Sequence, residues 1–220
     1  MKLPAFAVPV GHMCQPAVST PTPHRFFVLW LETIFTTGRR TVTKIIRTVR
    51  PHATGHVSAD YRVCSPRHWS TWKVARRWLT VRLTYGLPTG PVWLAGDDPL
   101  AARPGPHVFG QARHRDGVRS THRDTAYRWG HPWGVVSGLV QWPGAVRPWA
   151  LPVWVAWYRS PEWAPAHGTR HQTPAHLTRR LLARLIRWLP ARRCIVGGET
   201  GYGTSETARF CGRECSDKER

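Results

Sequence analysis

The spacing of apolar residues predicts short helices in the first part of the chain. Apolar side chains recur at helical spacing from Phe26 to Ile34, and Gly38 follows as a residue typical of a helix end. Residues 41–49 and 69–83 repeat the pattern, with lysine or arginine between the apolar positions. Three amphipathic helices with basic outer faces are therefore expected in this part of the chain.

A segment rich in glycine and proline, residues 86–91, ends this pattern, and strands are predicted beyond it. Their expected ranges are 92–95, 134–142, 149–158 and 194–196. Pro152 interrupts the third of these ranges, which favours an edge strand or a bulge there. Residues 99–131 contain several glycines and prolines, and they are expected to form loops.

One longer helix is predicted before the last strand. Thr173 can cap its N-terminus, Pro174 suits its first position, and leucines between Leu177 and Leu189 form an apolar stripe. The resulting order of three strands, a helix and a fourth strand predicts a mixed α/β domain that follows a small helical region.

The charge balance indicates what the protein binds. The chain has 32 lysines and arginines against 12 aspartates and glutamates, which gives a formal net charge of +20. So large a surplus must lie on the surface, where it attracts a polyanion, and DNA is the expected partner. A coding bias toward arginine is the alternative explanation. The helical region fits either a small DNA-binding module or a plain bundle with solvated arginines.

Cysteine usage and hydropathy indicate the compartment. Five cysteines form no Cys-x-x-Cys pair, so structural or free thiols in a reducing cytoplasm are expected rather than a zinc site. Pro4 and Pro9 interrupt the apolar N-terminal run, and Glu32 interrupts the apolar stretch 26–35. We expect no signal peptide and no membrane segment, and a cytoplasmic, nucleoid-associated protein.

Carboxylates are few, and three of them follow the two short buried strands. Asp97 and Asp98 come directly after the first strand, and Glu199 comes after the last. If these strands are parallel neighbours, their carboxyl ends meet at one sheet edge and the acids lie a few ångströms apart. Such carboxylates suit Mg²⁺ or Mn²⁺. Each acid could instead only close a strand–loop junction.

Several segments resemble transposases of the DDE type from insertion sequences, whose catalytic domain has an RNase H-like fold. The most specific are Leu-Ala-Gly-Asp-Asp-Pro-Leu at 94–100 and Gly-Tyr-Gly-Thr-Ser-Glu at 201–206. The likeness continues through residues 104–116, 125–131, 147–153, 158–162 and 171–176. It covers about residues 26–211 and is dense rather than confined to one motif.

The resemblance implies a role for each acid. Asp98 takes the place of the first metal-binding acid, with Asp97 beside it, and Pro99 stands where threonine is usual. Glu199 takes the place of the second catalytic aspartate. Its extra methylene moves the carboxylate oxygens by about an ångström, which octahedral Mg²⁺ tolerates poorly.

The third acid of the family, a glutamate on a late helix, has no candidate in this sequence. Glu214 and Glu219 follow Cys211 too soon, and no strand or helix is expected between them and the preceding segment. An incomplete RNase H-like domain is therefore expected. The predicted regions are a flexible lead-in at 1–24, a helical DNA-binding region at 25–88, the partial catalytic domain at 89–211 and a polar tail at 212–220.

A dense group of arginines lies near the presumed acidic site and could contact phosphates, although a solvated loop is an equally good reading. The candidates are Arg113, Arg115, Arg119, Arg123 and Arg128. The resemblance implies Mg²⁺-dependent cleavage of DNA at element ends and strand transfer to target DNA, with DNA and a second copy of the chain as partners. We expect a truncated, inactive copy. The alternatives are a non-enzymatic DNA-binding remnant that competes for element ends, and a product that does not fold stably.

Overall fold

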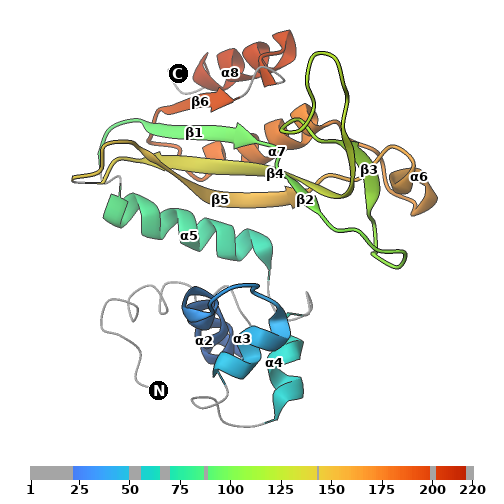
Figure 1. The fold of residues 1–220 in the computed structure, drawn as a ribbon. Helices are drawn as coiled ribbons and strands as arrows, with labels where there is room; N and C mark the ends of the chain where they lie inside the picture. The colour runs from blue at the N-terminus through green and yellow to red at the C-terminus, as the bar shows by residue number, and fades with distance from the viewer. Residues whose placement is uncertain are drawn as a thin grey trace. The chain divides into compact units, whose positions relative to one another are not determined.

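The computed structural model describes residues 22–49, 56–64, 70–86, 89–142, 144–198 and 202–216. The chain divides into two compact units, Met1–Tyr85 and Gly86–Arg220. Helices make up the described part of the first unit, and a mixed sheet with helices makes up the second (Figure 1).

The first unit contains the helices α2 (Thr22–Phe35), α3 (Val42–Val49), α4 (Val57–Val63) and α5 (Thr71–Gly86). The sequence predicts three of these helices correctly and misses α4, which has only seven residues. Apolar side chains from all four helices are buried, and they include Phe27, Val28, Leu31, Ile46, Val63, Ala75 and Leu79. The apolar spacing thus identifies part of the buried face of α2, α3 and α5, although Trp30, Ile34 and Val42 from the same pattern are exposed.

One arginine of α5 departs from the expected basic outer face. Arg82 is buried, with 8% of its surface exposed, and its guanidinium carbon lies 4.8 Å from the centre of the Trp78 ring. Burial lowers the pKa of Arg82 to about 10. The flat guanidinium lies over an aromatic ring of its own helix, an arrangement that favours a buried arginine through a cation–π contact.

The second unit is built on six strands. Their bounds are β1 (Val92–Asp97), β2 (Leu100–Ala102), β3 (Ala112–Arg115), β4 (Tyr127–Val140), β5 (Trp149–Trp157) and β6 (Cys194–Gly198). The four predicted strands are confirmed. The prediction of loops throughout 99–131 is wrong, because β2, β3 and the beginning of β4 lie there.

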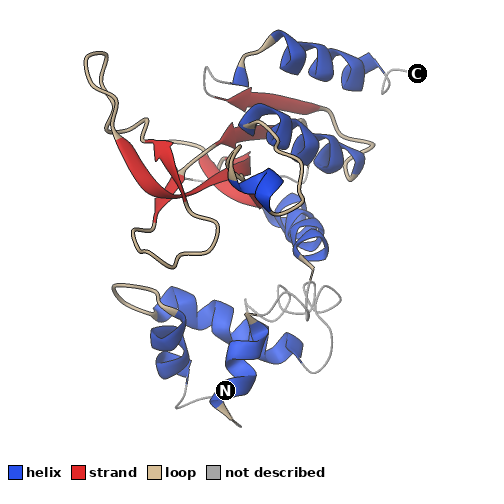
Figure 2. Ribbon diagram, turned by 90° about the vertical axis from the view of Figure 1, so that its right-hand side faces the viewer, coloured by secondary structure: helices blue, strands red, loops and turns tan. Residues whose placement is uncertain are grey.

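Glycine explains part of this error. A Cβ atom on Gly130 would lie 2.3 Å from the carbonyl oxygen of Ala101, so β2 approaches β4 more closely than any side chain would allow. This glycine therefore marks close contact between two strands rather than a loop. Two genuine loops precede and follow β3 and extend beyond the sheet (Figure 2).

The strand order is β2-β4-β1-β6, and β3 and β5 also pair with β4. β1 is antiparallel to β4 and parallel to β6. The register of β4 with β5 shifts between Val136 and Ser137, and Ser137 pairs with Pro152. The expected irregularity at Pro152 is confirmed, and the fold is mixed α/β as the sequence predicts.

Helix α7 (Pro174–Arg187) packs on one face of the sheet (Figure 1). The Thr173 hydroxyl accepts a hydrogen bond from the His176 backbone N–H at 3.2 Å, as the predicted cap requires. Gly134 lets the helix approach, because a Cβ atom there would lie 3.3 Å from a methyl carbon of Leu177. The smaller helix α6 (Trp163–Ala166) precedes α7, and α8 (Ser205–Ser216) follows β6.

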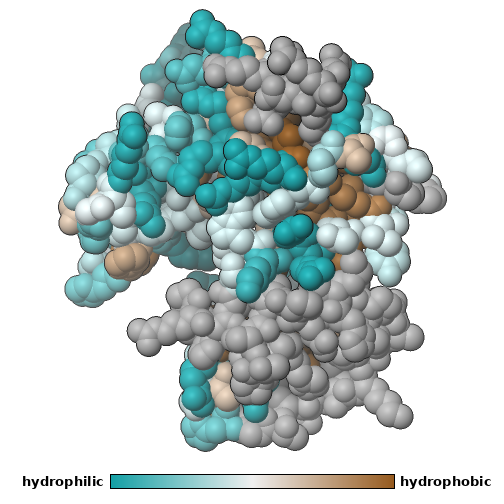
Figure 3. Space-filling model, turned by 180° about the vertical axis from the view of Figure 1, so that it is seen from behind, coloured by the Kyte–Doolittle hydropathy of each residue, from teal (hydrophilic) through white to brown (hydrophobic). Residues whose placement is uncertain are grey.

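The surface is largely hydrophilic in the view from behind, with smaller hydrophobic areas between the polar ones (Figure 3). None of the helices in the described ranges is both long and apolar enough to cross a membrane.

Replacing Leu185 by alanine should destabilise the protein, because this α7 side chain is fully buried. We expect the free energy of unfolding to fall by about 2–5 kcal/mol, from lost apolar burial and the cavity left behind. The exposed Arg187 on the same helix provides the control, and Arg187→Ala should change the unfolding free energy by less than about 0.5 kcal/mol. Urea unfolding curves of the three proteins measure both effects, and equal stability of the two variants would contradict the prediction.

Candidate active site and basic loop

The two strands that precede the predicted acids lie side by side. β1 and β6 are parallel, with Leu94 opposite Val196 and Gly96 opposite Gly198. Asp97 is the next residue of β1, and Glu199 is the next residue of the chain after Gly198. Glu199 itself lies outside the described residues, so the pairing is described as far as Gly198. The expected parallel pairing of these two strands is confirmed.

Asp97 and Asp98 occupy the carboxyl end of β1. Both are exposed, and a carboxylate oxygen of Asp97 accepts a hydrogen bond from the Asp98 backbone N–H at 2.8 Å. Asp97 pairs with Val135 of β4, so the two residues share one face of the sheet. Oxygen donors at a strand end have the chemistry that Mg²⁺ and Mn²⁺ require. The described residues, however, include no group of three or more His, Cys, Asp or Glu side chains that could hold a metal ion.

The opposite face of the same strand end lies against α7. A Cβ atom on Gly96 would lie 3.2 Å from the Thr178 methyl carbon, so glycine is needed where the helix approaches. Because side chains alternate along a strand, Gly96 faces the helix and Asp97 faces the other way. The packing of α7 therefore directs the side chain of Asp97 to the face that α7 does not cover.

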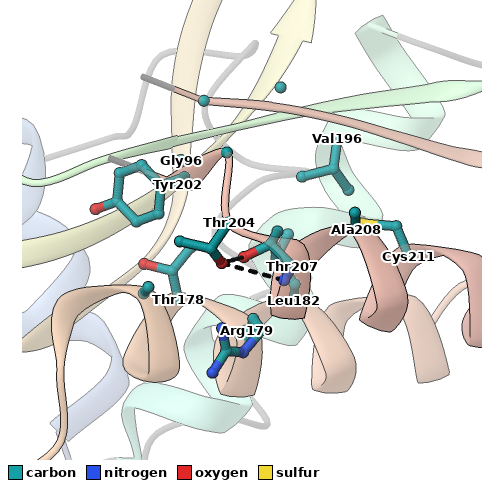
Figure 4. Close-up of a pocket in the computed structure, with 14 residues that line it drawn as sticks. Gly96, Thr178, Arg179, Leu182, Val196, Tyr202, Thr204, Thr207, Ala208 and Cys211 are labelled. Carbon is teal, nitrogen blue, oxygen red and sulfur yellow. Dashed lines mark hydrogen bonds between the residues drawn. The ribbon is translucent and has the colours of Figure 1, made fainter. Parts of the chain in front are cut away.

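A pocket of about 270 Å³ lies beside this strand end, between β6, α7 and α8 (Figure 4). Its walls include Leu182, Val196 and Ala208, together with backbone of the glycines near the end of β6. Thr178 also lines it, and the buried hydroxyl of this residue has no hydrogen-bond partner among the described residues. Among the described residues that line it, none carries a carboxylate.

Polar contacts close the α8 side of the pocket. The Thr204 hydroxyl accepts a hydrogen bond from the Thr207 backbone N–H at 3.2 Å (Figure 4). Arg179 donates to the Glu206 carboxylate at 2.7 Å, which joins α7 to α8. The charge of Arg179 is therefore compensated within the protein, and the pocket has mainly apolar walls.

The predicted phosphate-binding arginines surround a loop that a single buried acid organises. Asp116 is 6% exposed, and one of its carboxylate oxygens accepts the backbone N–H groups of Val118 at 3.1 Å and Arg119 at 3.2 Å. The other oxygen lies 3.5 Å from the Arg128 guanidinium and 4.0 Å from that of Arg119. Asp116 thus fixes the turn after β3 and neutralises part of the charge around it.

The structure separates the five candidate arginines. Arg113 and Arg115 lie on β3, opposite Trp129 and Tyr127, and they share an exposed face with these rings. Arg128 is opposite His114 and therefore lies on the other face of the ribbon. The two remaining candidates, Arg119 and Arg123, are exposed on the loop between β3 and β4.

A group of histidine, tyrosine and glutamate side chains lies beyond β5, and the sequence did not predict it. The Tyr158 hydroxyl is 3.0 Å from a ring nitrogen of His171, and burial raises the pKa of Tyr158. Burial lowers the pKa of His114, against the opposing effect of the Glu162 carboxylate. Hydrogen bonds from its own backbone and from Ser160 lower the pKa of the exposed Glu162. These side chains come from three segments that are separate in the sequence, at residue 114, residues 158–162 and residue 171. No local sequence pattern could therefore have indicated the group.

Comparison with known protein families matches residues 18–214 to the family described as DDE superfamily endonuclease. No curated protein and no solved structure gives a match. The matched range contains the whole sheet, α7 and both segments that carry the predicted acids. The chain therefore belongs to the DDE superfamily endonucleases, as the sequence resemblance implied.

Proposed function

We propose that the protein is a DNA transposase of the DDE type, which breaks and joins phosphodiester bonds with the help of carboxylate-held divalent ions. The observation that carries the proposal is the parallel register of β1 and β6, in which Gly96 pairs with Gly198. Acids that directly follow these two residues belong to neighbouring strand ends of one sheet edge. The family match supports the same reaction class.

We assign Asp98 and Glu199 as metal ligands, with Asp97 as the adjacent carboxylate. When bound there, Mg²⁺ or Mn²⁺ supplies Lewis-acid stabilisation of the charge that develops on the phosphodiester. The protein's own part is to hold the carboxylates at a rigid strand end. Gly96 and the packing of α7 provide that rigidity. The DNA partners would be element ends and target DNA.

The second candidate is a protein that binds element ends without cutting them and so competes with an active relative. Two residues favour it. Pro99 stands where the family pattern has threonine, and Glu199 stands where it has aspartate. The longer glutamate side chain displaces its oxygens by about an ångström, enough to weaken octahedral coordination.

In both candidates the arginines around β3 contact DNA phosphates. The segment from Leu100 to His171 contains nine arginines and three acids. One of these acids, Asp116, is buried and already engaged with Arg128 and with backbone N–H groups. The positive charge on this part of the surface is therefore not cancelled locally, which suits a polyanionic ligand.

Mn²⁺ binding tests the assigned ligands directly. Isothermal titration of the purified chain with MnCl₂ should show a site that Asp98→Asn weakens by at least about tenfold, because a ligand oxygen loses its charge. Glu199→Asp should strengthen the site, since the shorter side chain restores the family's ligand. Asp124→Asn removes an exposed acid from the β3–β4 loop and should leave the affinity unchanged. Equal effects of Asp98→Asn and Asp124→Asn would refute the assignment.

Nicking of supercoiled plasmid DNA in Mg²⁺ or Mn²⁺ separates the two candidates. Nicking by the wild-type protein that is absent in Asp98→Asn would establish the first candidate, the nuclease. Binding of the plasmid without nicking by the wild type, together with nicking by Glu199→Asp, would establish the non-cutting DNA-binding protein and locate its defect at residue 199. Failure of the wild type to bind plasmid at low salt would exclude both.

The salt dependence of duplex binding tests the arginines. Each phosphate contact that is lost should reduce the slope of log K against log salt by about 1, regardless of DNA sequence. We expect this reduction for Arg123→Ala, whose side chain is exposed on the loop. Arg179→Ala is the matched control, since this arginine is already paired with Glu206 and should leave the slope unchanged. Fluorescence anisotropy with a labelled duplex at several salt concentrations gives both slopes, and identical slopes for wild type and Arg123→Ala would contradict the prediction.

A further inference from the structure

Exposed aromatic rings and arginines share one face of the β3–β4 ribbon. Tyr127 is 51% exposed and Trp129 is 53% exposed, although both are in a strand. Arg115 lies opposite Tyr127, and Arg113 lies opposite Trp129. The guanidinium carbon of Arg113 is 4.7 Å from the centre of the Tyr127 ring, which confirms that these side chains point to the same side.

Further rings extend this face. His131 follows Trp129 on the same side of β4, and its ring centre lies 5.7 Å from that of Trp157. Phe109 is 72% exposed, and its ring centre is 6.1 Å from that of Trp157 and 5.5 Å from that of Trp163. We call this set the aromatic platform, and its residues are Phe109, Tyr127, Trp129, His131, Trp157 and Trp163.

The loop that carries Phe109 is held in place rather than loosely attached. Gly110 has a φ of +68°, and a Cβ atom there would lie 2.2 Å from the Trp157 ring. The backbone therefore lies directly against that ring, which only glycine permits. A ring nitrogen of His131 lies 2.8 Å from the Phe109 carbonyl oxygen, within hydrogen-bond distance. These contacts fix the exposed Phe109 ring in position before any ligand arrives.

Positive charge accompanies the rings. The guanidinium carbon of Arg159 is 5.5 Å from the centre of the Trp157 ring and 5.4 Å from that of Trp163. Together with Arg113 and Arg115, this places three cations on or beside the platform. Rings and arginines are also enriched at protein interfaces, but none of these three arginines forms an ion pair with a described acid, and such positive charge favours an anionic ligand.

From these observations we infer that the aromatic platform binds unpaired bases of a DNA strand. Exposed rings stack on bases, and neighbouring arginines contact the phosphates between them, which is how single strands are held without sequence readout. Bases within a duplex are stacked on each other and offer no free face, so duplex DNA is contacted mainly through its phosphates. This inference rests on the proposed function, because it identifies the form of DNA that the same protein engages.

The platform lies in line with the acidic strand end. Asp97 pairs with Val135, and the same side of β4 continues through Trp133 and His131 to Trp129. Six residues of a strand span about 20 Å. A strand whose unpaired bases stack on the platform can therefore run along β4 toward the carboxylates, separated from its complement.

Binding of a fluorescein-labelled twelve-nucleotide oligo(dT), measured by anisotropy, tests the inference on the full chain. Trp129→Ala should weaken oligo(dT) binding by roughly 5- to 100-fold, the loss expected for one stacked base. Trp129→Phe should recover most of the affinity, since a ring remains. The affinity for a duplex of the same length should change less than twofold in either variant.

Trp149→Ala is the matched control, because Trp149 is a strand tryptophan of similar exposure, 57%, outside the platform. Thermal unfolding of all variants verifies that each is folded. The inference is overturned if Trp129→Ala leaves the oligo(dT) affinity unchanged, or if Trp149→Ala lowers that affinity as much as Trp129→Ala does. In either case the proposed function stands as long as the protein still binds duplex DNA. If the wild-type protein bound neither oligo(dT) nor duplex DNA, both this inference and the proposed function would be overturned.

Discussion

The parallel pairing of β1 with β6 is the constraint on which the candidate site depends. Parallel strands need a crossover connection, and the chain between β1 and β6 returns to the sheet through α7, which packs on one face of it and leads into β6. Gly96 and Gly134 lie under the helix, and a Cβ atom there would lie 3.2 Å from a Thr178 methyl or 3.3 Å from a Leu177 methyl, so a larger residue would make these side chains shift. The glycines thus set the distance between helix and sheet, and the helix in turn leaves one side of the strand end for Asp97.

The length of β4 connects this strand end to the basic surface. Its fourteen residues pair with β1 toward one end and with β2 and β3 toward the other. A shorter strand, such as the sequence predicted, would have separated the acids from the arginines by flexible loop. Because β4 pairs with the end of β1 at Val135 and carries Tyr127, Trp129 and His131 further along, Asp97 and the aromatic platform have a fixed relation to each other. A nuclease that binds one segment of DNA and cuts a bond in another segment needs such a fixed relation between its two sites.

The sequence predicted the elements whose signals are local. Short apolar runs identified β1 and β6, and Thr173 with Pro174 identified the start of α7. The adjacency of the acids followed from the assumption that the two strands are parallel, which the register confirms as far as Gly198. The family resemblance then supplied roles for Asp98 and Glu199 that no spacing alone could provide.

What the sequence missed depends on contacts between distant segments. In β3 the arginines alternate with alanine and histidine, and β2 has only three residues, all apolar, so neither segment is long or apolar enough to predict a strand. Trp129 lies in the range predicted as loop, and its pairing with Arg113 places it in a strand, on the same face as that arginine. Arg82 was expected on the surface because arginine usually is, and only the folded structure shows it to be buried.

Most of the ion pairs in the described part of this basic chain join an arginine to an acid from another segment. Asp60 pairs with Arg25 at 2.7 Å, Asp116 with Arg128, and Glu206 with Arg179. In each case the acid neutralises an arginine and joins two segments. Among the ion pairs between described residues, none involves Asp97, although arginines are abundant. The exposed Asp124 on the β3–β4 loop is outside these ion pairs as well, so lack of an arginine partner does not by itself distinguish Asp97. What distinguishes the end of β1 is its place beside the end of β6 in a parallel pair, and the proposed cation site depends on that register.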